Sequence, residues 1–263
     1  MKSPVRAKKH LGQHFLKDEQ IAKNIVESLL FKQKENTVLE IGPGMGVLTK
    51  YLLQNNNFTT HIIDIDRESI EYLHQLFPQL KERIISGDFL KLPLNELFKE
   101  QFIVIGNFPY NISSQILFKI LENKNQVTEV VGMFQKEVAE RIASTPKKKT
   151  YGILSVFMQA YYTVEYLFTV NEDVFDPPPK VKSAVIRFTR NQNVRLNCNE
   201  DLFVKVVKTG FNQRRKTLRN ALKSLLPQNP ETEIPFLNQR AEELSYQEFE
   251  HLTNSIEENI DKD

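Results

Sequence analysis

Residues 38–49, VLEIGPGMGVLT, decide the fold, because an apolar strand-like run passes into a glycine-rich turn and then into a helical pattern. Gly42, Gly44 and Gly46 alternate through this turn. Glycine lets the backbone turn sharply and approach a ligand closely, as in nucleotide-binding loops at helix starts. A dinucleotide fingerprint requires a third glycine three positions after the second, where this chain has Val47. The pattern disfavours NAD and leaves another nucleotide-like ligand, or none, open.

Strand-like and helical patterns alternate around this loop. Strands are expected at residues 36–42, 59–66, 82–90 and 101–107, and helices at residues 46–55, 67–76, 113–122 and 134–143. Such alternation predicts an α/β fold with a parallel sheet covered by helices on both faces. Two later strands are expected at residues 164–170 and 183–189, separated by a stiff loop with three consecutive prolines. The pattern is helical from residue 199, so we place a domain boundary near residue 191.

The composition restricts the class of protein. Of the 263 residues, 40% are hydrophobic and 26% are charged, as in ordinary globular proteins. The single cysteine, Cys198, excludes an internal disulfide, and five scattered histidines give metal chemistry little support. No apolar run approaches the length of a membrane span or forms a signal segment after the basic N-terminus. We therefore expect a cytoplasmic protein without a metal ion or membrane contact.

The net charge of +2 hides a strong asymmetry along the chain. Residues 1–17 carry a net charge of +5 and residues 202–230 a net charge of +7, both without acids, whereas residues 231–263 carry −8. Basic blocks beside a nearly neutral body indicate a polyanionic partner, most often nucleic acid. A basic face that contacts only solvent is the alternative.

Three acids follow the second and third expected strands. Asp64 lies 22 positions after Gly42, where an acid can accept hydrogen bonds from ribose hydroxyls, and Asp66 competes for that role. Asp88 closes the next strand and can accept from an adenine amine. Each carboxylate alone has the alternative of capping a helix. Because the carboxyl ends of parallel strands share one edge, the set favours an adenosine cofactor without pyrophosphate, which is S-adenosylmethionine.

Residues 105–114, IGNFPYNISS, end the fourth expected strand with an amide, a rigid turn and an aromatic ring. The tetrapeptide NFPY resembles the shared motif of class I methyltransferases that methylate exocyclic amines. The resemblance implies that the Asn107 side-chain oxygen and the Phe108 carbonyl accept hydrogen bonds from an adenine amine. Pro109 would stiffen the turn, and Tyr110 would stack on a base extruded from its helix. A helix cap at Asn107 with Tyr110 in the core is the alternative.

Segments along nearly the whole chain resemble those of bacterial ribosomal RNA adenine dimethylases, especially the branch that acts on the small subunit. They are, in order, KKHLGQHFLKD, VLEIGPGMGVLT, IGNFPYNISS, VFDPPPKVKSAVIRF, FNQRRKTLRNAL and QRAEELSYQEFEHLTN. The resemblance implies a Rossmann-like class I methyltransferase domain at 1–190 and a small helical RNA- and subunit-binding domain at 191–263. It also implies a monomer that uses S-adenosylmethionine to convert two adjacent small-subunit adenosines to N6,N6-dimethyladenosine in an immature subunit.

The same resemblance assigns site residues one by one. Cofactor contacts are implied at His14, Leu16, Gly42, Gly44, Asp64, Asp88 and Asn107. Phe175 matches a family aromatic proposed to stack on the base opposite Tyr110, with anchoring of the proline loop as the alternative. The family commonly has asparagine where this chain has His14. Histidine can still donate a hydrogen bond, but its size and possible charge change the contact.

The basic stretch 211–226, FNQRRKTLRNALKSLL, is predicted to be a helix with an apolar side that packs. Phosphate contacts are expected from Arg214, Arg215, Lys216 and Arg219, and the run Lys147–Lys149 is a further RNA contact or a solvated loop. Such contacts give affinity and register, whereas specificity comes from RNA shape.

Three other functions stay open at this point. One is the related class that methylates large-subunit ribosomal RNA and confers macrolide resistance. Another is a subunit assembly factor whose binding does not need catalysis, and a more remote one is a DNA adenine methyltransferase.

Overall fold

The computed structural model describes residues 5–31, 37–192, 194–228, 230 and 232–260, so Lys2 of the basic N-terminus lies outside the described residues. Two compact units result, one from Met1–Ala139 and Val164–Arg190, the other from Glu140–Thr163 and Asn191–Asp263. The domain boundary near residue 191 stays a prediction, since the second unit also contains residues 140–163.

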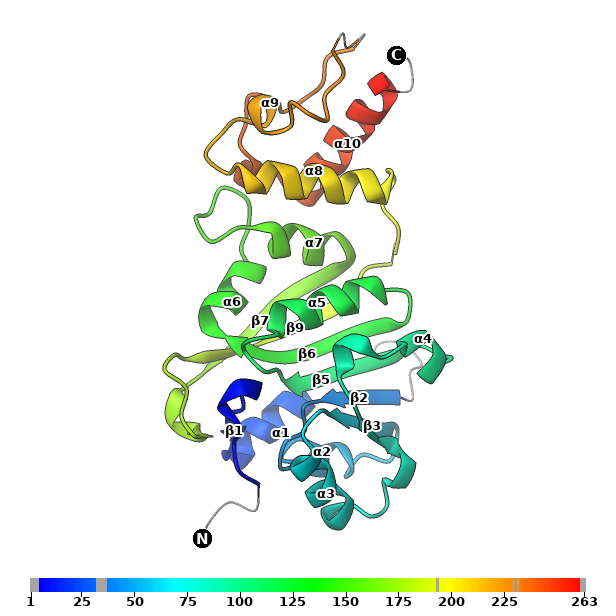
Figure 1. Cartoon of the computed structure of the whole chain (residues 1–263), viewed down its shortest axis with the longest axis vertical. Helices are drawn as coiled ribbons and strands as arrows, with labels where there is room; N and C mark the ends of the chain where they lie inside the picture. Colours follow the sequence, from blue (N-terminus) through cyan, green and yellow to red (C-terminus); the bar gives the residue numbers. More distant parts are fainter. Residues whose placement is uncertain (1–4, 32–36, 193, 229, 231, 261–263) are drawn as a thin grey trace. The chain divides into compact units, whose positions relative to one another are not determined.

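The first unit is built on a twisted sheet (Figure 1). Its strands are β2 (Thr37–Ile41), β3 (Thr59–Asp64), β4 (Ile84–Ser86), β5 (Phe102–Asn107), β6 (Val127–Gln135), β7 (Tyr162–Val170) and β9 (Ser183–Arg190). Within the described residues they form seven strands in the order β4-β3-β2-β5-β6-β9-β7. Neighbouring strands from β4 to β6 are parallel, and β9 is antiparallel to β6. The predicted α/β fold is confirmed, with an antiparallel pairing added at one side.

The helices that accompany these strands include α1 (Glu19–Glu27), α2 (Thr49–Leu52), α3 (Arg67–Leu76), α4 (Leu94–Leu97), α5 (Ser113–Glu122) and α6 (Lys136–Ile142), with 3-10 turns η1 (Lys9–Leu11), η2 (Lys81–Arg83), η3 (Phe89–Lys91) and η4 (Glu172–Val174). The predicted helices after the parallel strands are found as α2, α3, α5 and α6, whereas α1 and α4 were not predicted. Short polar side chains start several of them. The Asp18 carboxylate accepts from the Ile21 N–H at 2.9 Å, and Asp66 accepts from the Glu68 N–H at 3.1 Å.

Both faces of the sheet are buried. On one face Val38, Ile103 and Met133 pack with Ala22 and Ile25 of α1 in one hydrophobic cluster. On the other face the neighbouring positions of the same strands, such as Leu39 and Val104, are also buried. Since side chains alternate along a strand, only a sheet covered on both sides buries successive residues in this way.

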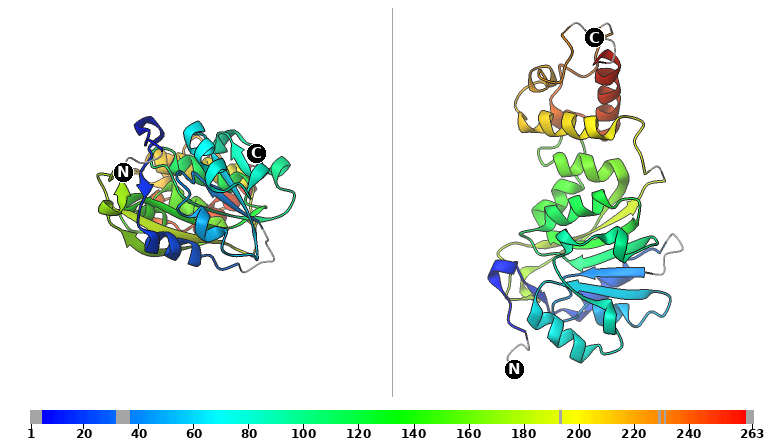
Figure 2. Two further views of the ribbon diagram at one scale, coloured as in Figure 1. Left: turned by 90° about the horizontal axis from the view of Figure 1, so that it is seen from below. Right: turned by 45° about the vertical axis from the view of Figure 1, so that its right-hand side comes forward.

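A small second sheet ties the N-terminal segment to the proline loop. Its strands are β1 (Phe15–Leu16) and β8 (Phe175–Asp176), paired antiparallel. The His14 Nδ1 also lies 2.7 Å from the Pro177 carbonyl oxygen, although the two residues are 163 positions apart. In Figure 2 the blue N-terminal segment lies beside the yellow-green segment that holds β8. This pairing fixes the segment that carries GQHFL.

The second unit is helical. It contains α7 (Ile153–Tyr161), α8 (Glu200–Asn212), α9 (Leu218–Ala221), the turn η5 (Ala241–Glu243) and α10 (Tyr246–Ile260). The prediction of one basic helix over residues 211–226 is wrong, because α8 ends at Asn212 and α9 spans four residues. The Leu218 and Arg219 N–H groups donate to the carbonyls of Gln239 and Leu237, at 2.7 and 2.8 Å, instead of to a preceding helical turn. Leu218 is fully buried there.

Two absences concern the described ranges only. Among these residues no helix is long and apolar enough to cross a membrane. Within the same ranges no three histidine, cysteine or acidic side chains gather where they could hold a metal ion.

One carboxyl group lies inside the sheet layer. Glu40 of β2 is 1% exposed, and its Oε2 accepts a hydrogen bond from the Thr49 hydroxyl at 2.6 Å. Burial raises the pKa of Glu40 to about 8, against the lowering effect of that bond, and the charge of Asp64 adds to the rise. The folded protein therefore holds Glu40 protonated at pH values where the unfolded chain ionises it.

This burial predicts a loss of stability with rising pH. The contribution is fully present below the ordinary glutamate pKa of 4.5 and is lost as the pH rises towards about 8. Glu40→Gln keeps a neutral acceptor for Thr49 and removes the titration. Between about pH 5 and about pH 8, we expect the urea midpoint of the wild type, followed by circular dichroism, to fall relative to that of the variant. The exposed Glu100→Gln is the control, and equal slopes for wild type and Glu40→Gln would contradict the prediction.

Candidate functional site

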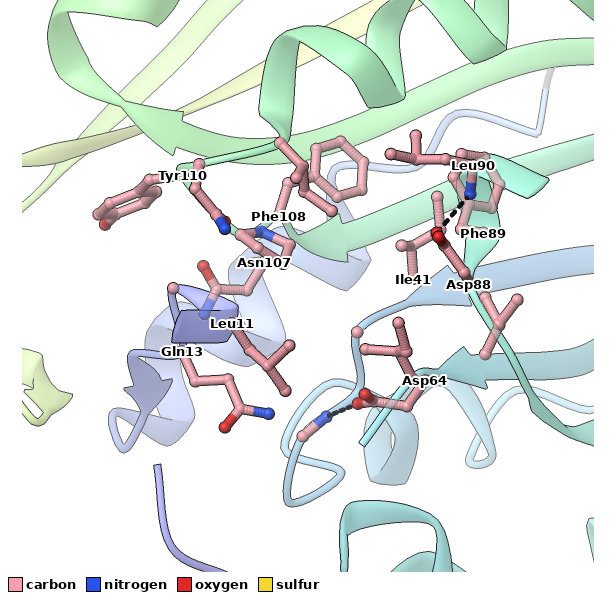
Figure 3. A pocket seen from close by; sticks show the side chains of 18 of the residues that line it. Leu11, Gln13, Ile41, Asp64, Asp88, Phe89, Leu90, Asn107, Phe108 and Tyr110 are labelled. Atoms are coloured by element: carbon pink, nitrogen blue, oxygen red, sulfur yellow. Dashed lines mark hydrogen bonds between the residues drawn. The ribbon is translucent and has the colours of Figure 1, made fainter. Parts of the chain in front are cut away.

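A cavity of about 190 Å³ lies at the carboxyl ends of the parallel strands. Strand ends and the turns after them supply Ile41, Gly42, Gly44, Ile63, Asp64, Ile65, Gly87, Asp88 and Asn107. The N-terminal segment supplies Leu11 to Phe15, and the NFPY turn supplies Phe108 to Ile112. Figure 3 shows Asn107 and Tyr110 on one side of the cavity and Asp64 and Asp88 on the other. The structure thus gathers most of the predicted site residues around one cavity.

The glycine loop has a backbone that other residues rarely adopt. Gly42, Gly44 and Gly46 have φ values of +65°, +56° and +78°. Gly42 and Gly44 line the cavity, whereas Gly46 packs against Phe77, whose ring would lie 2.4 Å from an added Cβ. The first two glycines therefore face the cavity, and the third allows close packing with α3.

The two acids at the end of β3 differ in what they contact. Asp64 lines the cavity and is 6% exposed. Burial raises its pKa, partly offset by hydrogen bonds from the backbone N–H groups of Asp66 and Gly44. Those bonds measure 2.9 and 3.3 Å. Asp66 does not line the cavity, because its carboxylate is held by Lys8 and Gln13. This arrangement supports Asp64 over Asp66 as the ribose acceptor.

Asp88 caps a turn and also lines the cavity, while its contact with an adenine amine stays a prediction. Its Oδ1 accepts from the Leu90 N–H at 3.0 Å and so caps η3, while the residue lines the cavity. Its Oδ2 lies 3.8 Å from the Nζ of Lys91, whose side chain is 85% exposed. The capping bond fixes the carboxylate at the cavity wall and leaves the second oxygen for a ligand amine.

The amide of Asn107 has a defined orientation. Its Nδ2 donates to the His14 carbonyl oxygen at 2.9 Å, so Oδ1 is the atom left to accept. The Phe108 ring is buried against two glycines: a Cβ added to Gly106 or Gly132 would lie 2.8 or 2.4 Å from it. The Phe108 N–H donates to the Met133 carbonyl at 3.2 Å. The packing of the Phe108 ring and this main-chain bond therefore hold the turn that carries the Asn107 oxygen in place.

Tyr110 is held from two directions. Its hydroxyl is hydrogen-bonded to the Ser183 hydroxyl, and its ring stacks with the His14 ring at a centroid distance of 5.4 Å and an interplanar angle of 28°. Burial raises the pKa of Tyr110, which keeps the phenol neutral. The His14 Nδ1 faces the Pro177 carbonyl, which only accepts, so this nitrogen carries a proton.

Two predicted site residues do not line this cavity. Leu16 lines a smaller adjoining pocket with Gly42, Gly44 and Asn107. Phe175 is 0% exposed and belongs to the same hydrophobic cluster as Leu16. Its burial fits the anchoring role for the proline loop, and stacking on a base stays a prediction.

The sequence did not single out the other residues of the cavity wall. They are Leu11, Gly12, Gln13, Phe15, Ile41, Ile63, Ile65, Gly87, Phe89, Leu90, Asn111 and Ile112. One signal was present: each lies within a few positions of a predicted contact. Ile65 stands between the two acids of β3 and is 55% exposed, unusual for a large apolar side chain.

The residues around the cavity fit S-adenosylmethionine. Asp64 offers a fixed carboxylate for ribose hydroxyls, Asp88 an acceptor for an adenine amine, and Ile65 and Phe89 apolar surface for the base. Gly42 and Gly44, the loop residues that line the cavity, have no side chains to obstruct the methionine part. Asn107 and Tyr110 line the same cavity, so the NFPY turn would lie beside a bound cofactor.

The second unit brings the two predicted RNA-binding stretches together. Lys147, Lys148 and Lys149 are exposed, as are Arg215, Lys216 and Arg219. Arg214 is only partly exposed: its Nη2 donates to the Lys149 carbonyl at 2.8 Å, and its Nε lies 3.7 Å from Glu242 Oε2. The Lys147 N–H in turn donates to the Glu242 carbonyl at 2.8 Å. We call the six exposed residues the basic surface; Arg214 connects its two halves.

Comparison with known proteins agrees with this geometry. The model of the ribosomal RNA adenine dimethylase family matches residues 5–258. A protein of Cytophaga hutchinsonii named ribosomal RNA small subunit methyltransferase A is 61% identical over 252 residues, which cover 96% of this chain and 98% of that protein. A protein of the same name from Flavobacterium johnsoniae is 58% identical over 254 residues, covering 96% and 97%.

Solved structures agree on the fold. A dimethyladenosine transferase from Plasmodium falciparum superposes with a TM-score of 0.78 at 25% identity, covering 94% of this chain and 98% of that one. The 23S rRNA methyltransferase ErmE superposes with a TM-score of 0.69 at 21% identity, covering 92% and 99%, and shows a shared fold alone. Because the family match spans both units, the chain belongs to the ribosomal RNA adenine dimethylase family.

Proposed function

We propose that this protein transfers methyl groups from S-adenosylmethionine to N6 of two adjacent adenosines in small-subunit ribosomal RNA, giving N6,N6-dimethyladenosine. The observation that carries the proposal is the rigid NFPY turn, whose Asn107 oxygen is left to accept beside the cofactor cavity. The relatives at 58–61% identity are named as small-subunit methyltransferases, which supports this branch of the family.

The chemistry needs positioning more than a strong base. The adenine amine is a weak nucleophile because its lone pair is delocalised into the ring. Hydrogen bonds to the Asn107 Oδ1 and the Phe108 carbonyl favour a pyramidal nitrogen with its lone pair aimed at the methyl group, which the bound cofactor supplies. Tyr110 orients the base by stacking, and its neutral phenol adds no charge near the reacting atoms. Preorganised contacts of this kind lower the barrier without a proton-accepting side chain.

The basic surface gives the RNA a docking site in the second unit. Its exposed lysines and arginines suit phosphate contacts, which fix position without reading bases. Arg214, which the sequence analysis counted among these contacts, has a carbonyl and a carboxylate as neighbours, so we assign it to holding the surface together. We further propose that the protein acts as a monomer in the cytoplasm, on an immature small subunit.

The large-subunit alternative rests on the fold shared with ErmE. One experiment separates the two: incubate the protein with S-adenosylmethionine and undermethylated small or large subunits, then analyse nucleosides by mass spectrometry. We expect N6,N6-dimethyladenosine only from small subunits. Product only from large subunits would favour the resistance branch, and no product with intact cofactor binding would favour an assembly factor.

Tyr110→Ala should leave the affinity for S-adenosylhomocysteine nearly unchanged and lower kcat/KM for RNA by about 5- to 150-fold, the equivalent of losing a base stack of about 1–3 kcal/mol. Tyr110→Phe is the matched control, because it keeps the ring and removes only the bond to Ser183. Calorimetry and a filter methylation assay give the two quantities. Equal weakening of both by Tyr110→Ala would identify Tyr110 as a core residue.

Arg215→Ala should reduce the slope of log K for RNA against log salt concentration by about 0.7–0.9, the release expected for one phosphate contact. The control is Lys99→Ala, an exposed lysine just before β5 and hence at the opposite edge of the sheet from the cavity. Arg214→Ala should lower affinity through the geometry of the surface and change the slope less. A slope for Arg215→Ala equal to that of Lys99→Ala would remove this residue from the interface.

A further inference from the structure

The N-terminal segment Lys8–Phe15, here called the strap, forms one wall of the cofactor cavity with Leu11, Gly12, Gln13, His14 and Phe15. It contains one 3-10 turn, η1, which is closed by Gly12 with φ +67°. Beyond the pairing of Phe15 with Asp176 of β8, its position depends on hydrogen bonds along its two sides. Those bonds reach two different strand ends of the sheet.

One side of the strap, with Lys8 and Gln13, is held just after the end of β3. The Lys8 Nζ forms an ion pair with Asp66, whose side chain is fully buried, and lies 3.3 Å from a Glu68 oxygen. The Gln13 Nε2 donates to the second Asp66 oxygen at 3.1 Å, while its Oε1 accepts from the Lys8 N–H at 2.8 Å. Lys8, Gln13 and Asp66 therefore form a closed set of bonds, which we call the clasp.

Charge reinforces the clasp. The hydrogen bond to Asp66 raises the pKa of Lys8, so its ammonium stays charged. Burial acts to raise the pKa of Asp66, but the bonds from Lys8 and Gln13 prevail and the pKa lies below its ordinary value. A buried carboxylate without its partner is costly, so the contact with the buried Asp66 holds the strap more strongly than the contact with the exposed Glu68.

The other side of the strap, with His10 and His14, is held at the end of β5. Asn107 donates to the His14 carbonyl at 2.9 Å, and Asn111 donates to the His10 carbonyl at 3.4 Å. A Cβ at Gly12 would lie 2.6 Å from the Asn111 Oδ1, so the strap passes this turn closely. The strap thus bridges β3 and β5 across the end of β2, where the glycine loop lies.

We propose that Lys8, Gln13 and Asp66 are positioning residues that clasp the strap over the cofactor cavity and thereby set the rate at which S-adenosylmethionine and S-adenosylhomocysteine leave. The proposal rests on the proposed function, since it assigns the cavity to that cofactor. Lys8 and Asp66 do not line the cavity, so they act on the cofactor only through the strap. It also gives Asp66 a role distinct from ribose binding by Asp64.

Coupling of this kind is reciprocal. If the closed clasp slows release, bound cofactor must equally favour the closed clasp. The strap amides should then exchange hydrogen more slowly when ligand is bound, and a broken clasp should speed both exchange and release. This gives a readout that does not depend on methyl transfer.

The test uses the full chain and S-adenosylhomocysteine as the probe. Lys8→Met breaks the ion pair, and Asp66→Asn removes its charge while retaining a good N-cap for α3. Lys9→Met is the matched control, because Lys9 is exposed, lies in the same strap, and has no ion pair recorded within the described ranges. Lys8→Arg keeps the charge and should behave nearly as the wild type.

We expect Lys8→Met and Asp66→Asn each to speed dissociation of S-adenosylhomocysteine on the order of tenfold, within the usual range of coupling factors. The double variant should dissociate no faster than the worse single variant, because both break one contact. KM for S-adenosylmethionine should rise at unchanged kcat, and exchange at residues 8–14 should quicken in both variants. Lys9→Met should change none of these quantities.

A Lys8→Met variant that dissociates and exchanges like Lys9→Met would overturn the clasp while leaving the proposed function intact. A lower kcat at saturating cofactor, with unchanged dissociation, would also overturn it, since the clasp would then act on chemistry. Failure of the wild type to bind S-adenosylhomocysteine would overturn the proposed function, and the clasp with it.

Discussion

The parallel register of β2 with β3 and β5 is the constraint on which the site depends. Val38 pairs with Thr60 on one side and Ile103 on the other, so these strands run in step and end at a common edge. Ile41, Asp64 and Asn107 are the last residues of the three strands and all line the cavity. A slip of one residue in either pairing would turn Asp64 or Asn107 to the other face of the sheet. The close packing of side chains on both buried faces opposes that slip, because a shifted strand would no longer fit its neighbours.

The geometry of the site depends on main-chain hydrogen bonds as much as on side-chain contacts. The Gly42 N–H donates to the Ile63 carbonyl at 2.9 Å, which fixes the glycine loop to β3. The His14 carbonyl receives the Asn107 amide, which fixes the strap to β5. The loops are held by main-chain atoms of the sheet or by side chains attached to its strands. The Asn107 Oδ1 is therefore already oriented, and no further energy is needed to orient it when a substrate binds.

Much of the first unit was predictable from local patterns. The helices at Arg67–Leu76 and Ser113–Glu122, and the strand ends at Asp64 and Asn107, lie where periodicity and punctuation put them. Two of the elements that the sequence analysis missed are buried all round. β6 is nearly fully buried along its length and shows no alternation, and α7 buries most of its residues and shows no polar stripe.

The helix predicted around Arg214 was wrong for another reason. The stretch does have helical periodicity, but Leu218 and Arg219 bond to residues about twenty positions ahead, which no local pattern records. Local sequence patterns could not predict the clasp either, because Lys8 and Gln13 lie 58 and 53 positions from Asp66.

The way Arg214 holds the basic loop has a consequence for sequence variation. Its Nη2 bonds to the main-chain carbonyl of Lys149, and the Lys147 main-chain N–H bonds to the main-chain carbonyl of Glu242. Every residue type except proline offers both of these groups, so the attachment does not specify which side chains the loop carries. The shape of the surface therefore does not depend on its charge: the loop can exchange one lysine for another residue without losing its place beside Arg215 and Lys216. Substitutions would be tolerated at the exposed lysines of the loop, whereas a substitution of Arg214 would disturb the surface.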